Sequence, residues 1–234
     1  MKTWVKSSIL QLTSVARVLA LFSRHGQLVQ RSYRRRYAPL ANFVSKTGAS
    51  KVLDIGCGLG FLKPLFDKKN ICYLGVDESH ETIEIARQLY GTESFRNVSF
   101  AANLLGEKKF DFAILLTVLD EVTEKEQFLM ELYKVLADHG WAYIAFRNSD
   151  FPMRKPKAAE VPDMSFREYK KLFEKAGFKV LDQGVFYRPW LTGFSFLGVK
   201  NVVYRVISYF LPSSLGYMGF MLIKKRWPNS LNGG

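Results

Sequence analysis

The residues best suited to chemistry lie in one short stretch that combines three glycines with a carboxylate. The stretch is Val52-Leu53-Asp54-Ile55-Gly56-Cys57-Gly58-Leu59-Gly60. The apolar run over residues 51–55 predicts a buried strand, and the spaced glycines predict a tight loop whose backbone can approach a ligand closely. The apolar residues that follow predict a helix, and the first N–H groups of a helix have no partner within it. Such an arrangement is typical of a nucleotide-binding site.

The residues around these glycines bear on the identity of the ligand. The dinucleotide fingerprint G-x-G-x-x-G requires a glycine at position 61, where this chain has Phe61. Asp54 lies two residues before the first glycine, and a carboxylate at that place favours a cation or an amine over a pyrophosphate. The alternative is an ordinary strand–turn–helix without a ligand. This motif alone does not decide between the two.

A second acid follows the next predicted strand. The apolar run over residues 71–76 ends at Asp77, 23 residues after Asp54. An acid at the carboxyl end of the second strand of a Rossmann-type sheet can accept hydrogen bonds from ribose hydroxyls. His80, close behind it, is more simply interpreted as a loop or helix-cap side chain. Asp77 therefore adds a polar group of the kind that a nucleotide site requires.

The glycine stretch resembles motif I of the class I S-adenosylmethionine (SAM)-dependent methyltransferases, apart from Leu59, where Thr, Ser or Ala is commoner. The resemblance extends over about residues 33–225, in the order of motifs, and is strongest to the small-molecule and quinone-biosynthesis branch. It implies SAM as cofactor. It also implies that Asp54 and the loop residues Gly56, Cys57, Gly58 and Gly60 hold the methionine end of SAM.

The same resemblance implies further cofactor contacts. Asp77 would bind the ribose, and Asn103 stands where the family usually has an Asp that reaches the adenine amino group. The other implied cofactor contacts are Glu78, Leu104, Leu116 and Thr117. The acids Asp120 and Glu121 follow the fourth predicted strand, at the junction of cofactor and acceptor in the family. They are the candidate catalytic groups; their alternative role is as acids at a helix N-terminus.

Strand and helix patterns alternate along the chain, which predicts an α/β fold with a doubly wound, Rossmann-like sheet. The family implies seven strands, mostly parallel, with an antiparallel last strand. We expect strands at residues 51–55, 71–76, 98–102, 110–119, 141–146, 179–182 and 216–227, and helices at 33–46, 126–136 and 166–176. Ser165 and Glu168 predict a capping box, and Gly177 predicts the end of that helix. The expected organisation is a basic amphipathic N-terminal helix (1–32), a methyltransferase domain (33–227) with an aromatic, basic insertion at about 186–216, and a tail (228–234).

The net charge of +13 is unevenly distributed. Residues 1–53 carry ten Lys or Arg and no acid, residues 54–150 sum to −6, and residues 151–234 sum to +9. Basic flanks around an acidic centre indicate an anionic partner, either membrane lipid or, less favoured, nucleic acid. The segment 1–32 has three interpretations: an interfacial membrane helix, a mitochondrial targeting segment, or a helix packed on the domain. We expect a cytoplasmic protein at a membrane periphery, with a mitochondrial location as the alternative.

The expected function is methyl transfer to an O or C atom of an apolar or amphipathic small molecule, possibly lipid-linked, at a membrane surface. The Asn/Asp-Pro-Pro-Tyr motif of amino-directed members is absent after the fourth strand, which disfavours transfer to a base nitrogen. An RNA methyltransferase and a non-catalytic scaffold subunit are the alternatives. The two cysteines, Cys57 and Cys72, lack metal-ligand spacing, so no metal is expected and a reducing compartment is indicated.

Overall fold

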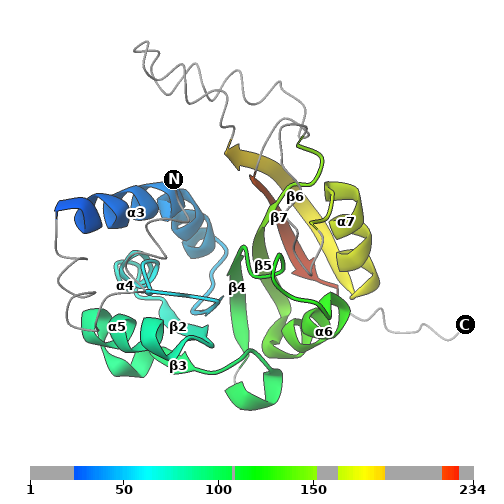
Figure 1. Ribbon diagram of the computed structural model, residues 1–234. Helices are drawn as coiled ribbons and strands as arrows, with labels where there is room; N and C mark the ends of the chain where they lie inside the picture. Colours follow the sequence, from blue (N-terminus) through cyan, green and yellow to red (C-terminus); the bar gives the residue numbers. More distant parts are fainter. Residues whose placement is uncertain (1–23, 107–108, 152–162, 188–217, 227–234) are drawn as a thin grey trace, which may run out of the picture. The chain divides into compact units, whose positions relative to one another are not determined.

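The computed structural model describes residues 24–106, 109–151, 163–187 and 218–226, which fall into two compact units, residues 1–114 and 115–234 (Figure 1). The expectations for residues 1–23, for most of the insertion and for the tail therefore lie outside the described residues. Within the described residues, no helix is both long and apolar enough to cross a bilayer.

The first unit contains a parallel sheet built around a strand that is buried along almost its whole length. In β1 (Lys51–Ile55) every residue after Lys51 is buried, as expected for a central parallel strand. It pairs in parallel with β2 (Cys72–Asp77), which pairs in parallel with β3 (Phe95–Asn97). The other elements are α3 (Arg24–Lys46), α4 (Lys63–Asp67), α5 (His80–Tyr90), the short 3₁₀ helices η1 (Thr92–Ser94) and η2 (Ala102–Leu105), and β4 (Phe110–Leu116), which ends in the second unit.

The second unit is built around an antiparallel strand. The last strand, β7 (Met218–Lys225), runs antiparallel to both β5 (Leu136–Arg147) and β6 (Phe178–Tyr187). Its helices are α6 (Lys125–Val135) and α7 (Phe166–Lys175). The predicted capping box is confirmed, because the Ser165 side chain accepts from the Glu168 N–H while the Glu168 carboxylate accepts from the Ser165 N–H. Buried rings of Phe146, Tyr169 and Phe173 form its aromatic core.

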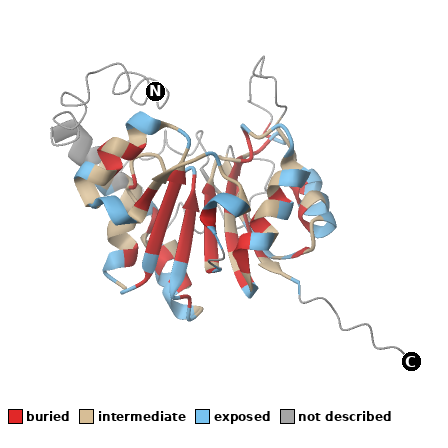
Figure 2. Cartoon of the chain, turned by 90° about the horizontal axis from the view of Figure 1, so that it is seen from below, coloured by how far each residue is buried: buried red, intermediate tan, exposed pale blue. Residues whose placement is uncertain are grey.

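The strands follow the order β3-β2-β1-β4-β5-β7-β6, which confirms the predicted seven-stranded, Rossmann-like sheet with an antiparallel last strand. Figure 2 shows that buried residues concentrate on the strands, as expected for a sheet covered by helices.

Several predicted boundaries were wrong. The third strand was expected at 98–102 but lies at Phe95–Asn97, where the Phe95 ring fills the space above Gly75. The fourth strand ends at Leu116 because the backbone turns at Thr117, whose φ is +66°. The fifth was expected at 141–146 but begins at Leu136, directly after α6. Helix α3 runs unbroken through residues 32 and 33, where we expected one segment to end and another to begin.

Candidate functional site

The glycine loop after β1 is held in a left-handed backbone conformation that suits glycine. Gly56, Gly58 and Gly60 have φ of +68°, +52° and +67°. The N–H groups of Gly56 and Cys57 both donate to the carbonyl of Val76, at 2.8 and 3.1 Å. These bonds fix the start of the loop to the end of β2. The sequence prediction of a tight glycine turn is confirmed.

The glycines of this loop have different surroundings. A Cβ added to Gly60 would lie 2.5 Å from the Phe95 ring, so this glycine is required by packing against the core. A Cβ added to Gly58 would meet no atom within 4 Å. The loop at Gly58 therefore borders open space, which is the geometry expected where a backbone receives a ligand.

Asp54 is a buried carboxylate for which the described residues supply no cation. It is 3% exposed, and its Oδ2 accepts a hydrogen bond from the Tyr73 hydroxyl at 2.5 Å. No ion pair to Asp54 is present among the described residues. Burial raises the pKa of Asp54 to about 7; the Tyr73 hydrogen bond opposes this rise, and the nearby Asp77 adds to it. A positively charged ligand group would supply the missing partner.

Asp77 ties the loop to the end of β2. Its Oδ2 accepts from the Gly58 N–H at 2.8 Å and its Oδ1 accepts from the Ser79 N–H at 2.9 Å. An ionised carboxylate has about four lone-pair sites, so these two bonds leave capacity for hydroxyl donors. The loop, Asp54 and Asp77 thus form one arrangement, as the sequence predicted.

Helix α3 covers this loop with aromatic residues that sequence reasoning missed. The ring of Tyr33 lies 4.8 Å from that of Tyr37 and 5.8 Å, edge-on, from that of Phe61 in the loop. Burial raises the pKa of Tyr33, with smaller contributions from Tyr37 and Asp54. The available signal was the i,i+4 spacing of Tyr33 and Tyr37 on the face that also carries Val44, which is fully buried.

The remaining predicted cofactor residues of the first unit lie at its edge. Glu78 is exposed, and its carbonyl accepts from the Asn97 side chain at 2.9 Å. Asn103 and Leu104 lie in η2 and are both exposed, and Leu104 is 49% exposed although it is a large apolar residue. An exposed apolar side chain beside an amide offers a surface for a planar base.

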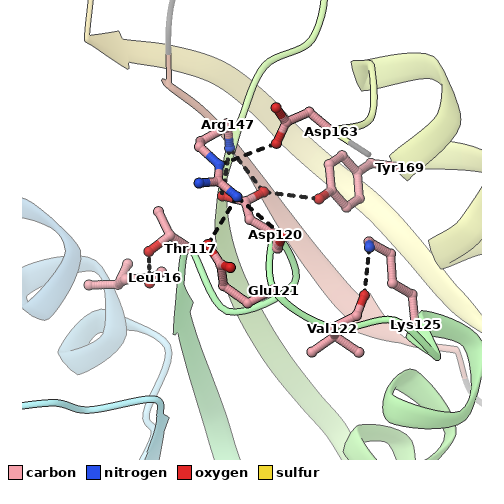
Figure 3. Close-up of polar contacts among 9 residues, drawn as sticks. All are labelled: Leu116, Thr117, Asp120, Glu121, Val122, Lys125, Arg147, Asp163 and Tyr169. Carbon is pink, nitrogen blue, oxygen red and sulfur yellow. Dashed lines mark hydrogen bonds and ion pairs between the residues drawn. The ribbon is translucent and has the colours of Figure 1, made fainter. Parts of the chain in front are cut away.

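In the second unit, two residues that follow β4, Asp120 and Glu121, contact Arg147 at the end of β5 (Figure 3). Thr117 is a β-branched residue at φ +66°, a strained conformation that is uncommon outside functional sites and turns. Its N–H donates to the Ala145 carbonyl at 2.8 Å, and its hydroxyl donates to the Leu116 carbonyl at 2.5 Å. The strain at Thr117 marks this turn as a candidate functional element.

The two candidate catalytic acids differ sharply in exposure. The Asp120 side chain is fully buried; it accepts from the Arg147 N–H at 3.1 and 3.0 Å and from the Tyr169 hydroxyl at 3.2 Å. Glu121 has a 71% exposed side chain, 3.0 Å from an Arg147 guanidinium nitrogen. Both acids precede α6, which begins at Lys125, so neither is an acid of the first helical turn. Asp120 is thus a structural partner of Arg147, and Glu121 is the accessible carboxylate.

Arg147 links three acids. Besides Asp120 and Glu121, its Nε lies 3.2 Å from Asp163, the residue that precedes α7 by three positions. Lys125 lies near the same group, and burial lowers its pKa while its Nζ donates to the Val122 carbonyl at 2.7 Å. Among the described residues, no group of three or more His, Cys, Asp or Glu side chains is arranged to hold a metal ion.

The first-unit arrangement suits a ligand with an amine or sulfonium and with hydroxyl donors. The Asp54 carboxylate, next to the open loop, would repel a pyrophosphate, whereas Asp77 could accept from ribose hydroxyls. The residues present therefore fit SAM, which carries a cationic methionine end and a ribose, and do not fit a dinucleotide.

A sequence model of the methyltransferase domain family matches residues 28–183, two thirds of the chain. This chain belongs to the methyltransferase domain family. SAM is the cofactor expected for this family, in agreement with the glycine loop and its two aspartates.

Curated relatives of this chain are named as methyltransferases, in agreement with the family. A ubiquinone biosynthesis O-methyltransferase of Bartonella bacilliformis is 27% identical over 160 residues, covering 59% of this chain and 64% of the relative. One of Pelagibacter ubique is 30% identical over 101 residues, 42% of each chain. This methyltransferase thus spans less than two thirds of the length of these relatives.

Solved structures share the fold. A SAM-dependent methyltransferase from Archaeoglobus fulgidus matches with a TM-score of 0.58 at 20% identity, covering 85% of this chain and 94% of its own. The [4+2]-cyclase SpnF matches with a TM-score of 0.57 at 17% identity, over 80% of each chain. Because a cyclase shares the fold, the fold alone does not determine the reaction.

Proposed function

We propose that this methyltransferase binds SAM in its first unit and transfers the methyl group to an oxygen or carbon atom of an apolar or amphipathic small molecule. The observation that carries the proposal is the buried Asp54 carboxylate, which has no cationic partner in the described part of the chain and stands beside a glycine loop open at Gly58. A buried carboxylate with a hydrogen bond but no cationic partner is costly to ionise unless a ligand supplies the positive charge.

Each residue of the first unit has a distinct part in this proposal. When bound, SAM supplies a methyl group already activated by a sulfonium, so the protein has to position and shield rather than activate. Asp54 would pair with the cationic methionine end, and Asp77 would accept from the ribose hydroxyls with its remaining lone pairs. Tyr33, packed against Phe61, would help to exclude water from the loop.

The acceptor class is supported by the names of the relatives. Several are ubiquinone biosynthesis O-methyltransferases, with identities of 27% and 30% for the two described above. A phenolic hydroxyl on a lipid-linked ring is therefore the acceptor that we propose, at a membrane surface. Of the two acids after β4, only Glu121 is accessible, so it is the candidate to accept the hydroxyl proton.

The proposal is tested in two steps with the full chain. Calorimetric titration of SAM and S-adenosylhomocysteine should show micromolar binding that Asp54→Asn weakens. A methyl-transfer assay with a polyprenylated phenol should then show turnover, which Glu121→Gln lowers through kcat with little change in the KM for SAM. Absence of SAM binding by the wild type would overturn the enzyme assignment in favour of a scaffold. Binding with turnover only on RNA would overturn the acceptor.

A further inference from the structure

Helix α3 has two faces of different character. Its inward face carries Tyr33, Tyr37 and Val44, and it packs against the glycine loop through the contact between Tyr33 and Phe61. Its outward face carries a set of exposed residues, which are Arg31, Arg35, Arg36, Pro39, Asn42, Ser45 and Lys46. One helix thus contacts the candidate cofactor loop on one side and solvent on the other.

The charged residues of the outward face are all cationic. Helix α3 contains six Lys or Arg and no Asp or Glu. No ion pair involves Arg31, Arg35 or Lys46 in the part of the chain that the structure describes. Two exposed lysines elsewhere in the chain do have acidic partners, in the pairs Lys134–Glu131 and Lys175–Glu126. The positive charge of Arg31, Arg35 and Lys46 is therefore not compensated by an ion pair within the described fold.

We propose that this outward face of α3, defined by Arg31, Arg35 and Lys46, binds the anionic headgroups of a phospholipid bilayer. The proposal rests on the proposed function, because a lipid-linked acceptor requires an enzyme that works at a membrane. Basic side chains within a Debye length of an anionic bilayer each contribute to binding, without any need for specific contacts. The charge of α3 is complementary to that surface.

The composition of this face favours lipid over nucleic acid. Proteins that bind single-stranded nucleic acid combine cations with exposed aromatic rings on which the bases stack. The aromatic residues Tyr33 and Tyr37 of α3 point inward and are packed against other rings, and Phe43 contacts Phe112. The exposed described residues of α3 are cationic or small and polar, apart from one proline, and include no aromatic residue.

Binding through this face would set the distance of the cofactor loop from the membrane. A helix with its side chains is about 10–12 Å in diameter. Because Tyr33 touches the loop from the opposite side of α3, the loop would lie roughly one helix diameter from the headgroups. A soluble cofactor would then meet an acceptor whose lipid tail remains in the bilayer.

The test uses the full-length protein and vesicles of phosphatidylcholine with or without phosphatidylserine. The triple variant Arg31→Gln, Arg35→Gln, Lys46→Gln should lower the partition coefficient for anionic vesicles about 100-fold, because three basic side chains that contribute to binding are lost. Each tenfold loss corresponds to roughly 1.4 kcal/mol of binding free energy. A matched control, Lys68→Gln, Lys170→Gln, Lys171→Gln, removes the same charge from exposed positions outside α3 and should change it less than about threefold. Wild-type binding should also fall with added salt.

Equal losses in the two triple variants would show that only net charge matters and would overturn the proposal. An unchanged α3 variant would overturn it too, and would place any binding elsewhere in the chain. Loss of RNA binding with intact vesicle binding would assign the face to nucleic acid instead. Titration of S-adenosylhomocysteine into both variants keeps this test separate from the proposed function, because a protein that fails to bind cofactor can still be scored for vesicle binding.

Discussion

Two buried aspartates, one in each unit, illustrate how the same side chain serves two purposes. Asp54 and Asp120 are both almost inaccessible to solvent, and each accepts a hydrogen bond from a buried tyrosine, Tyr73 and Tyr169 respectively. They differ in their cations. Asp120 is paired with Arg147, whereas Asp54 has no ion pair among the described residues.

The difference separates a structural carboxylate from one available to a ligand. A buried charge that the fold compensates contributes to folding, and removing its partner is strongly destabilising. Where the fold supplies no cation to a buried carboxylate, burial raises the pKa of that carboxylate, as at Asp54. A ligand can then supply the positive charge. In this methyltransferase the comparison indicates a structural role for Asp120 and supports the proposal that Asp54 binds the cofactor.

The largest effect is expected for Asp120→Ala. The substitution removes the acceptor of the Arg147 and Tyr169 bonds and leaves Arg147 partly buried beside fewer acids. We expect the free energy of unfolding to fall by about 3–5 kcal/mol. Denaturant unfolding followed by circular dichroism measures this loss.

The control for that variant is Glu121→Ala, which removes the exposed acid on the same arginine. An exposed ion pair contributes about 0–1 kcal/mol, so unfolding should change little. Similar losses for the two variants would contradict the distinction between a buried structural acid and an accessible one.

The second-largest effect is expected for Asp54→Asn. Unlike Asp120→Ala, it should lower the affinity for the ligand and leave the stability of the fold intact. Asn retains an acceptor for the Tyr73 hydroxyl but has no charge to bury, so stability at neutral pH should equal or exceed that of the wild type. Affinity for S-adenosylhomocysteine should fall about 10- to 100-fold, since a hydrogen bond to a charged group contributes about 1.5–3 kcal/mol. Calorimetric titration measures the affinity.

Asp67→Asn is the matched control in the same unit, since Asp67 is exposed and pairs only with its neighbour Lys63. Its affinity for the cofactor product should equal that of the wild type. A destabilised Asp54→Asn protein with normal affinity would reverse the comparison.

The site of the first unit could be predicted from the sequence because its determinants are local. Asp54 and the three glycines lie within seven consecutive residues, and their types predict a buried strand followed by a tight turn. That the turn borders open space at Gly58 is known only from the structure. The capping box of Ser165 and Glu168 was predictable for the same reason, as it depends on residues three apart.

The determinants of the second unit are not local, and the sequence did not reveal them. Asp120 and Arg147 are 27 residues apart, and nothing in either neighbourhood indicates that they meet. The third strand was misplaced because a tertiary contact, Phe95 above Gly75, outweighed the apolar run that follows it. The role of Asp120 could therefore be assigned only once its burial was known.

A smaller effect is expected for Gly58→Ala in the loop. At φ +52° an alanine is strained by about 1–2 kcal/mol, although its Cβ would meet no atom of the protein. The same holds for Gly48, at φ +79° just after α3, which is the matched control. Both variants should lose similar stability, but only Gly58→Ala should also lose affinity for S-adenosylhomocysteine. Equal affinities in the two variants would show that the open side of Gly58 does not face the ligand.

The smallest effect is a dependence on pH. Raising the pH should change the stability of the first unit and its affinity for the ligand in opposite directions. The folded pKa of Asp54, about 7, lies above its ordinary value of 3.8, so the folded state holds its proton more tightly than the unfolded state. Its contribution to stability is therefore complete below about pH 4 and declines as the pH rises to about 7. The cationic ligand prefers the ionised form, so its affinity should change in the opposite direction.

With a pKa of about 7, the ionised fraction of Asp54 rises about fivefold between pH 6 and pH 7, and the affinity for S-adenosylhomocysteine should rise by that factor. The ligand amine, with an ordinary pKa near 8, stays protonated over this range. Burial raises the pKa of Tyr33, Tyr73 and Cys57 around Asp54, so these groups stay neutral and do not contribute to the slope. Asp54→Asn should abolish the slope. A slope that survives in that variant would have to come from another group and would remove Asp54 from the cationic end of the site.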